Sequence, residues 1–157
     1  MFNDQGDELP VGEVGEVVVR GTNVMLGYWG KPELTKTVIV DGWLHTGDLA
    51  RMDEDGYFYL IDRARDMFIS GGENVYPAEI ERVLRKHPDV EDIAGVGVPD
   101  ESWGEAGCAF VIAKPGADLN SEDLIGFCDG QLARYKWPKK ILIAEDFPRT
   151  ALGKVRK

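Results

Sequence analysis

The sequence predicts an α+β fold in two parts, and three observations support this prediction. Residues 1–62 show short strand patterns separated by glycine and proline turns. Residues 67–157 combine a helical spacing of apolar residues with longer strand patterns. A charged run, Asp62-Arg63-Ala64-Arg65-Asp66, separates the strand-rich pattern from the mixed helix-and-strand pattern. We therefore assign residues 63–66 as a linker between two structural units.

The first unit reads as a set of strands without a helix. Residues 16–20 form a short strand pattern, and residues 21–41 are irregular, with Lys31-Pro32 among the breakers. Residues 49–52 and 57–61 flank a polar turn that ends in Gly56, which is a strong hairpin signal. These strands carry too few apolar residues to close a core alone. We expect the end of a larger domain, whose orphan strands could also pair between chains.

The second unit alternates helices and strands. Pro77 stands where a helix would begin, an apolar stripe follows at helical spacing, and His87-Pro88 ends it. A second helix is predicted after residue 120, where either Asn120 or Ser121 can act as the cap. The remaining strand patterns lie at residues 90–98, 106–113 and 141–143.

Composition and charge exclude several classes of protein. The chain has 157 residues, of which 43% are hydrophobic and 29% charged, as in folded domains. Its net charge of −10 disfavours a nucleic-acid-binding protein. No 18-residue apolar window is present, and the first residues do not resemble a secretory signal. Two cysteines without metal-ligand spacing favour a reducing cytoplasm.

The charge is unevenly distributed along the chain. Residues 134–157 contain eight basic and two acidic side chains, although the whole chain is acidic. A basic tail on an acidic protein suits a polyanionic small molecule as ligand. A solvated tail that only aids solubility is the other interpretation.

Two polar positions near the linker are candidate ligand-binding residues. Asp48 follows Thr46-Gly47, and a carboxylate there could accept hydrogen bonds from a vicinal diol such as ribose. Arg63 and Arg65, if extended, point the same way and could meet phosphate or ribose oxygens. The alternatives are an aspartate that caps its own turn and two solvated arginines.

Three further candidates lie in the second unit. The pair Gly71-Gly72 follows a strand pattern and precedes the helix, so its backbone could approach a ligand closely. Trp103 lies in a turn-rich polar stretch and could stack on a heterocycle. Lys154 could deliver a positive charge to a phosphate in a transition state. A tight turn, a tryptophan packed on its own sheet and a tail lysine are the corresponding structural alternatives.

Together these segments form a recognisable series. In order, they are Gly15-Glu16-Val17-Val18-Val19-Arg20-Gly21 with Gly27-Tyr28, Trp43-Leu44-His45-Thr46-Gly47-Asp48, Gly56-Tyr57-Phe58 to Asp66, Ile69-Ser70-Gly71-Gly72-Glu73-Asn74-Val75-Tyr76-Pro77, and Pro148-Arg149-Thr150-Ala151-Leu152-Gly153-Lys154. The series resembles the C-terminal portion of the adenylate-forming superfamily, in particular the acyl-CoA synthetases. The resemblance implies a small mobile C-terminal domain, with a mixed sheet and packed helices, preceded by a β-rich stub of the large N-terminal domain.

The resemblance also implies roles in nucleotide chemistry. Asp48 matches the residue that binds the ribose hydroxyls of ATP and of the acyl-adenylate, and Arg63 matches a contact to the same nucleotide. Arg65 falls at the hinge position, where the family more often has Asp or Lys. Lys154 matches the lysine that bridges the carboxylate substrate and the α-phosphate. We expect Lys154 to be the catalytic residue of this chain.

A CoA site is implied at a second group of positions. Gly71 and Gly72 match its glycine loop, and Trp103 matches the residue that stacks on the adenine. Tyr135 and Lys139 also match CoA-contacting positions. Where some relatives place an arginine for a CoA phosphate, this chain has Trp137.

The implied activity is ATP-dependent ligation of an acid to CoA, in two steps through an acyl-adenylate. We expect ATP, CoA and a fatty or related hydrophobic acid as substrates. The family's triphosphate loop, adenine motif, magnesium carboxylate and acyl pocket precede the position of Gly15, so we expect Mg²⁺ to be held outside this chain. On this basis we predict a fragment that cannot adenylate alone.

Two other functions remain open at this point. A carrier-protein-loading adenylation domain shares most of these motifs, although residues 70–77 resemble the CoA-ligase version of the loop. A non-catalytic module that binds CoA or a nucleotide, or an oligomer built by strand exchange, would also fit.

Overall fold

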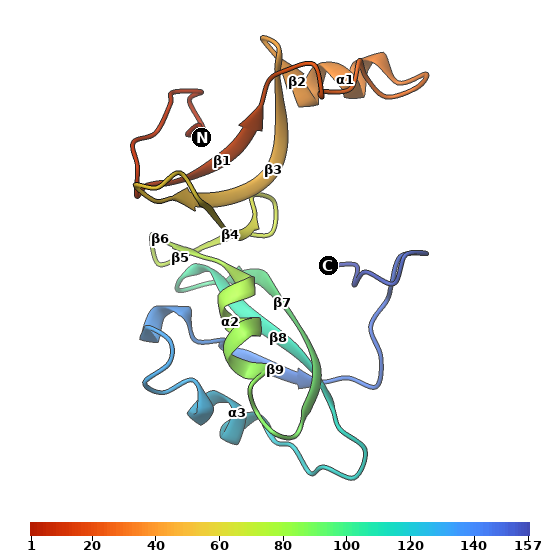
Figure 1. Ribbon diagram of the computed structural model, residues 1–157. Coiled ribbons are helices and arrows are strands. Elements are labelled where there is room, and N and C mark those ends of the chain that lie inside the picture. The colour runs from red at the N-terminus through yellow and green to blue at the C-terminus, as the bar shows by residue number, and fades with distance from the viewer. The chain divides into compact units, whose positions relative to one another are not determined.

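The computed structural model describes residues 1–157 and divides them into two compact units, residues 1–64 and 65–157 (Figure 1). Each unit carries its own sheet. The predicted α+β fold class is confirmed. None of the helices is long and apolar enough to cross a membrane.

The first unit is built around one long strand. Strand β3 (Trp43–Met52) pairs antiparallel with β1 (Val14–Val19), with the short β2 (Ile39–Val40) and with β4 (Phe58–Arg63). Between β3 and β4, Gly56 has φ of +84°, a value that glycine adopts without strain. The predicted hairpin between these strands is therefore confirmed.

One prediction for this unit is wrong. Helix α1 (Pro32–Val38) lies within the segment predicted to be irregular, and the unit therefore does contain a helix. Pro32 occupies the first turn, where its missing N–H removes no helical hydrogen bond, so it begins a helix here and does not break one. An ion pair between Lys36 and Glu33 adds a contact one turn apart.

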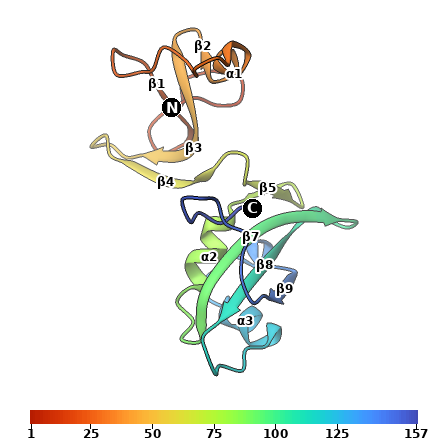
Figure 2. The ribbon, with the colours of Figure 1, turned by 90° about the vertical axis from the view of Figure 1, so that its right-hand side faces the viewer.

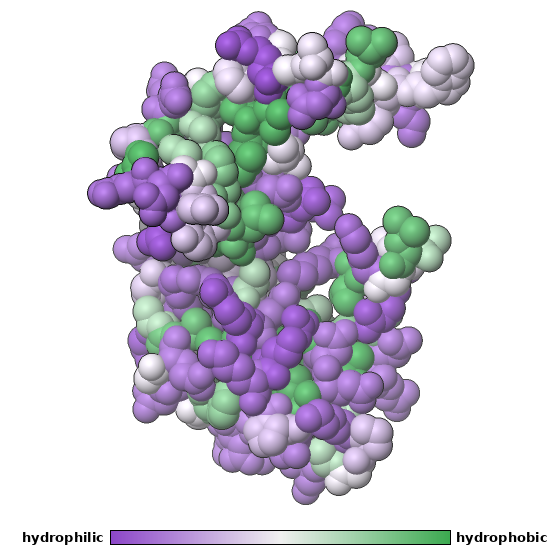
Figure 3. Space-filling model, viewed as in Figure 1, coloured by the Kyte–Doolittle hydropathy of each residue, from purple (hydrophilic) through white to green (hydrophobic).

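The first unit has very little hydrophobic core. Ala50 is its one fully buried hydrophobic residue, and helix α1 buries none. Large apolar side chains on β4 are exposed, including Phe58 at 50% and Leu60 at 71%. Hydrophobic residues are visible on the surface of this unit in Figure 3. The stability of the unit therefore rests mainly on strand pairing and local turns.

The second unit contains a five-stranded mixed sheet. Its elements are β5 (Phe68–Ser70), β6 (Glu73–Val75), α2 (Pro77–Leu84), β7 (Val90–Asp100), β8 (Gly104–Ala113), α3 (Ser121–Phe127), a 3₁₀ turn η1 (Arg134–Lys136) and β9 (Lys140–Ile143). The strand order is β6-β5-β8-β7, and β9 pairs with β8 in parallel. The β7–β8 pairing dominates the sheet and is long and antiparallel (Figure 2).

Both predicted helices of this unit are present. Helix α2 begins at Pro77, and the Asn120 side chain caps α3 by accepting a hydrogen bond from the Asp123 amide at 2.9 Å. The structure thus selects Asn120 over Ser121 as the cap. The glycine pair differs from the prediction, because Gly71-Gly72 form the turn of the β5–β6 hairpin and do not lead directly into the helix.

A single buried cluster joins the sheet to both helices. Its members come from β5 to β9, α2 and α3: Phe68, Val75, Ile80, Leu84, Val90, Ile93, Ala109, Val111, Leu124, Cys128 and Ile141. Burial raises the pKa of the Cys128 thiol to about 11, so it stays protonated at neutral pH. Both cysteines are free and buried.

Glycines in the strands allow close approach of other side chains to the sheet. A Cβ atom at Gly97 would lie 2.5 Å from Phe68 Cβ and 2.7 Å from Phe68 Cγ. At Gly107 it would lie 3.3 Å from Pro138 Cα. Both glycines are in strands, where glycine is otherwise unfavourable, so their value here is the space that they leave.

We predict that Gly97→Ala destabilises the second unit by about 1–3 kcal/mol, because the new methyl group overlaps Phe68. Gly126→Ala is the matched control, since a Cβ there meets nothing within 4 Å and alanine favours the helix by up to about 1 kcal/mol. Urea unfolding of the full chain, followed through the β7 and β8 amide signals, measures both. Equal stability of the two variants would contradict the packing argument.

Candidate functional site

Asp48 and Arg63 form an ion pair within the first unit. The two residues face each other across β3 and β4, and Arg63 Nε lies 2.7 Å from Asp48 Oδ1. The Arg63 Nη1 atom also approaches the Thr46 carbonyl oxygen at 3.4 Å. The side chains are 50% and 36% exposed, so a ligand can reach both. This pair offers an acceptor for hydroxyl groups beside a donor for phosphate oxygens.

The backbone in front of Asp48 is held by Glu16. Gly47 has φ of +72° and donates its amide hydrogen to Glu16 Oε1 at 2.8 Å. The other oxygen of Glu16 lies 2.7 Å from His45 Nδ1. One carboxylate on β1 therefore fixes His45 and Gly47 of β3, within three residues before Asp48. The sequence placed Glu16 in a strand but did not indicate this contact, which joins residues 31 positions apart.

The linker is a turn and not an extended segment. Residues 64–66 form turns, and the Ala64 amide donates to the Gly47 carbonyl oxygen at 2.9 Å. The expectation that Arg63 and Arg65 are extended and point the same way is therefore wrong. Arg63 completes β4, whereas the Arg65 side chain is 83% exposed and lies 3.4 Å from Asp66.

In the second unit, the indole ring of Trp103 lies against the backbone of Gly71. A Cβ atom at Gly71, which has φ of +61°, would be 2.5 Å from Trp103 Cε3. The Gly71 amide also donates to the Trp103 carbonyl oxygen at 3.0 Å. A larger residue at position 71 would displace the ring. Gly72 has φ of +88°, and a Cβ atom added there would have no other atom within 4 Å.

Trp103 borders a recess of about 560 Å³ with mostly basic and aromatic walls. The lining residues are Trp103, Ile125, Arg134, Tyr135, Trp137, Pro138 and Lys139. Lys139 Nζ lies 4.7 Å from the centre of a Trp103 ring, and the Arg134 guanidinium lies 4.0 Å from that of Trp137. Three of the predicted CoA residues, Trp103, Tyr135 and Lys139, thus line one recess. Arg134 adds a second cation to it, which was not predicted from the sequence.

The 3₁₀ turn beside this recess is tied to helix α2. Lys136 Nζ lies 2.6 Å from Glu79 Oε2, with both side chains largely buried. Burial alone would lower the pKa of Lys136, but the hydrogen bond and the charge of Glu79 outweigh it and raise the pKa above its usual value. The pair fixes the segment that carries Tyr135 and Trp137.

Lys154 lies on a small hairpin near the end of the chain. Arg149 and Val155 form a β-bridge, and the Thr150 amide donates to the Lys154 carbonyl oxygen at 2.8 Å. Lys154 is exposed, and its ammonium group has no hydrogen bond or ion pair within the protein. The ammonium group is therefore available to an anionic ligand.

No group of three or more histidine, cysteine, aspartate or glutamate side chains is gathered to hold a metal ion. We assign no metal ligand to this chain.

The chain is similar to known proteins over most of its length. Residues 79–154 match the family model of the AMP-binding enzyme C-terminal domain. Feruloyl-CoA synthase from Amycolatopsis is 49% identical over 152 residues, covering 97% of this chain and 31% of that protein. Long-chain-fatty-acid–CoA ligase from Escherichia coli is 46% identical over 155 residues, covering 99% and 28%. The chain thus spans less than a third of the length of these relatives.

A solved structure gives the same result. The o-succinylbenzoate CoA synthetase of Bacillus subtilis, in complex with its acyl-adenylate intermediate, superposes with a TM-score of 0.91 at 36% identity. The match covers 98% of this chain and 31% of that one.

The fold and these similarities show that the chain is similar to the C-terminal domain of AMP-binding enzymes over residues 79–154, and to a CoA synthetase over nearly its whole length. The match to the AMP-binding enzyme C-terminal domain lies wholly within the second unit.

We predict that Glu16→Ala loosens the backbone before Asp48. Alanine removes both carboxylate contacts, so about 1–2 kcal/mol of local stability is lost. The Gly47 amide should then exchange with solvent about 5–30 times faster by NMR. Glu13→Ala is the control, because Glu13 is exposed and forms no side-chain hydrogen bond. Unchanged exchange at Gly47 would contradict the proposed contact.

Proposed function

We propose that this chain is the C-terminal part of an ATP-dependent acid–CoA ligase. In the first step, a carboxylate oxygen attacks the α-phosphorus of ATP, the bond to pyrophosphate breaks and an acyl-adenylate forms. In the second step, the CoA thiolate attacks the acyl carbon and AMP leaves. The observation that carries this proposal is the coexistence of an exposed lysine hairpin and a basic aromatic recess on one small domain.

The first unit supplies the nucleotide contacts in this proposal. Asp48 accepts the ribose hydroxyl groups, and Arg63 turns part of its guanidinium toward the same nucleotide. The existing ion pair holds both groups in place before the ligand arrives. Glu16 supports them by fixing Gly47.

Lys154 acts in the first step. Negative charge accumulates on the phosphoryl oxygens as the carboxylate attacks, and an ammonium group beside them lowers the barrier. The exposed and unpaired Nζ atom of Lys154 suits this role, because no internal contact has to be broken first.

The recess beside Trp103 receives CoA in the second step. Trp103 is 41% exposed and offers a stacking surface for the adenine when the Lys139 ammonium group moves from over its ring to the ligand. Tyr135 and Arg134 line the same recess. Gly71 and Gly72 allow the narrow pantetheine arm to pass close to the backbone. The Gly71–Trp103 contact keeps the glycine turn beside the stacking surface.

The linker allows one domain to serve both steps. We assign Arg65, at the turn between the units, as the hinge residue. Rotation about Arg65 withdraws the Lys154 hairpin from the adenylate and brings the Gly71–Trp103 surface to it. The two can alternate in this way because they lie on different elements of the second unit.

A hydrophobic carboxylic acid is the proposed acyl substrate, with fatty acids as one option. Relatives of nearly equal similarity bear the names of feruloyl and long-chain fatty acid ligases, so similarity in this region does not select among acids. Two free, buried cysteines suit a cytoplasmic location.

We expect the chain to complete a functional ligase when joined to a related N-terminal part. The test replaces the matching region of the Escherichia coli long-chain-fatty-acid–CoA ligase with residues 1–157. This graft should form acyl-CoA from a fatty acid, ATP and CoA. Lys154→Ala should lower adenylation at least 100-fold, because a single transition-state donor contributes about this much.

Lys140→Ala is the matched control for the graft, since Lys140 is an exposed lysine of the same domain. The chain on its own should form no acyl-CoA. A folded graft without activity, or one indifferent to Lys154→Ala, would overturn the proposed reaction.

CoA should bind the chain itself at the recess. Trp103→Ala should weaken binding about tenfold, because stacking of a base contributes about 1–3 kcal/mol. Lys139→Ala should weaken it about fivefold through loss of an exposed charge contact. Isothermal titration calorimetry measures both, with Lys140→Ala as control for net charge. Equal effects of the two lysine variants would contradict a defined site, and CoA binding without activity of the graft would favour a non-catalytic CoA-binding module.

A further inference from the structure

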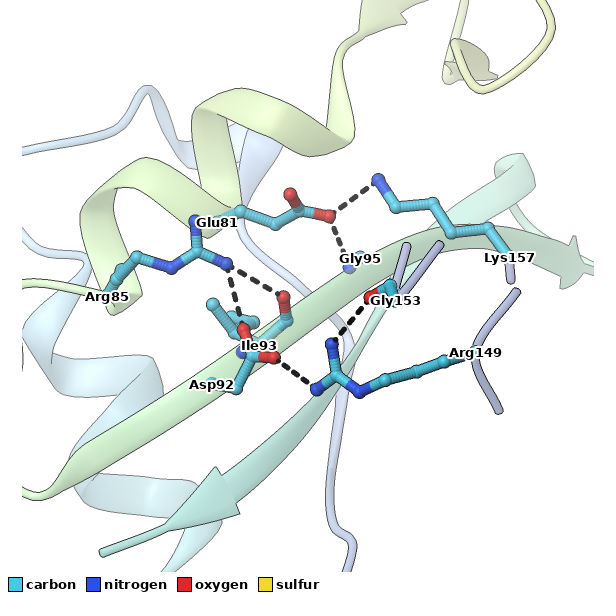
Figure 4. Close-up of polar contacts among 8 residues, drawn as sticks. All are labelled: Glu81, Arg85, Asp92, Ile93, Gly95, Arg149, Gly153 and Lys157. Carbon is cyan, nitrogen blue, oxygen red and sulfur yellow. Dashed lines mark hydrogen bonds and ion pairs between the residues drawn. The ribbon is translucent and has the colours of Figure 1, made fainter. Parts of the chain in front are cut away.

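The hairpin that carries Lys154 is attached to the second unit mainly through charged side chains. Its tip is exposed, with Leu152 at 89%, and the buried Phe147 lies before it in the chain. A segment with so few buried contacts opens easily unless polar anchors hold it. Figure 4 shows two such anchors, one at each end of the hairpin.

The first anchor joins Arg149 to Asp92 on β7. Arg149 Nη2 lies 2.8 Å from Asp92 Oδ2, and its Nη1 donates to the Gly153 carbonyl oxygen at 3.2 Å. Gly153 directly precedes Lys154, so one guanidinium connects the backbone next to the catalytic lysine with the sheet. The other oxygen of Asp92 lies 3.1 Å from Arg85, the residue that directly follows α2 (Figure 4).

Asp92 is well suited to remain charged in this position. Burial alone would raise the pKa of its carboxyl group. The hydrogen bond from Arg149, the Ile93 amide and the charges of both arginines outweigh this and hold the pKa below its usual value. The group therefore stabilises the fold above its ordinary pKa, and this contribution is lost only as the pH falls through the lowered value.

The second anchor joins Lys157 to Glu81 on α2. Lys157 Nζ lies 2.6 Å from Glu81 Oε1, and the two side chains are only 20% and 15% exposed. The same oxygen accepts the Gly95 amide hydrogen of β7 at 2.8 Å. Glu81 is thus held by the sheet and in turn holds the chain three residues beyond Lys154.

We propose that Asp92 and Glu81 are positioning residues for Lys154, acting through Arg149 and Lys157 to hold its hairpin against β7 and α2. This inference rests on the proposed function, because it assigns the anchors to the first step. Loss of an anchor should lower adenylation while leaving thioester formation intact, since Lys154 takes no part in the second step.

The docking of the hairpin is tested first on the 157-residue chain, without any activity. Asp92→Asn and Lys157→Met should each speed amide exchange of Thr150 and Arg156 by about tenfold, while the β7 and β8 amides keep their rates. Glu91→Gln is the matched control, because Glu91 is the exposed neighbour on β7 and forms no ion pair. If Asp92→Asn also accelerates exchange of the β7 and β8 amides, that variant has loosened the whole sheet, and the Lys157→Met variant then provides the test of hairpin docking. Unchanged hairpin exchange in Lys157→Met would overturn the proposal.

The graft described above tests the functional part. ATP–pyrophosphate exchange reports the first step, and acyl-CoA formation from synthetic acyl-adenylate reports the second. Each anchor variant should lower the first about tenfold, because small displacements of a catalytic group cost up to about 100-fold, and leave the second within about twofold. Equal loss in both steps would overturn the positioning role. If Lys154→Ala itself leaves the first step unchanged, the proposed function is wrong. The amide-exchange result still decides whether the anchors hold the hairpin, because it does not depend on activity.

Discussion

The antiparallel pairing of β7 with β8 is the constraint on which the second unit depends. This pairing runs from Val90–Ala113 to Asp100–Gly104 and provides the surface that β5, α2 and β9 contact directly. Gly97 and Gly107 leave room on it for Phe68 and Pro138, which bring β5 and the start of β9 onto the sheet. The recess is built largely by the segment before β9, which is joined to β8 by a hydrogen bond from the Lys139 amide to the Gly107 carbonyl oxygen. The lysine hairpin is joined to β7 through Asp92.

Several cations of the second unit are held by carboxylates that are themselves held by the fold. Glu79 binds Lys136 beside the recess, and Asp92 and Glu81 bind the lysine hairpin. Lys154 lacks such a partner and stays exposed. This difference separates cations that hold the domain together from cations without a carboxylate partner, such as Lys154, within a chain whose net charge is −10.

Local signals in the sequence were informative where the chain interacts with its near neighbours. Gly56 turns the β3–β4 hairpin, as its position indicated, and α3 is capped by Asn120, one of the two candidate caps. The same reasoning failed at Pro32, since a proline before a polar segment is compatible with both a break and a helix start. It also failed at the linker, because the turn after Arg63 depends on a hydrogen bond from Ala64 to Gly47, far away in the sequence.

The sequence by itself determined the two-part α+β organisation, the turns and caps, and the residue types that carry the proposed chemistry. Only the tertiary structure decided which of these residues meet. Trp103 lies on Gly71, Arg134 joins the recess, and Asp92 receives two arginines because strand register brings distant segments together. The physical reason is the distance along the chain over which each kind of interaction acts. Backbone preferences act over a few residues and can be read from their order, whereas side-chain contacts across a sheet follow from the packing of the whole domain.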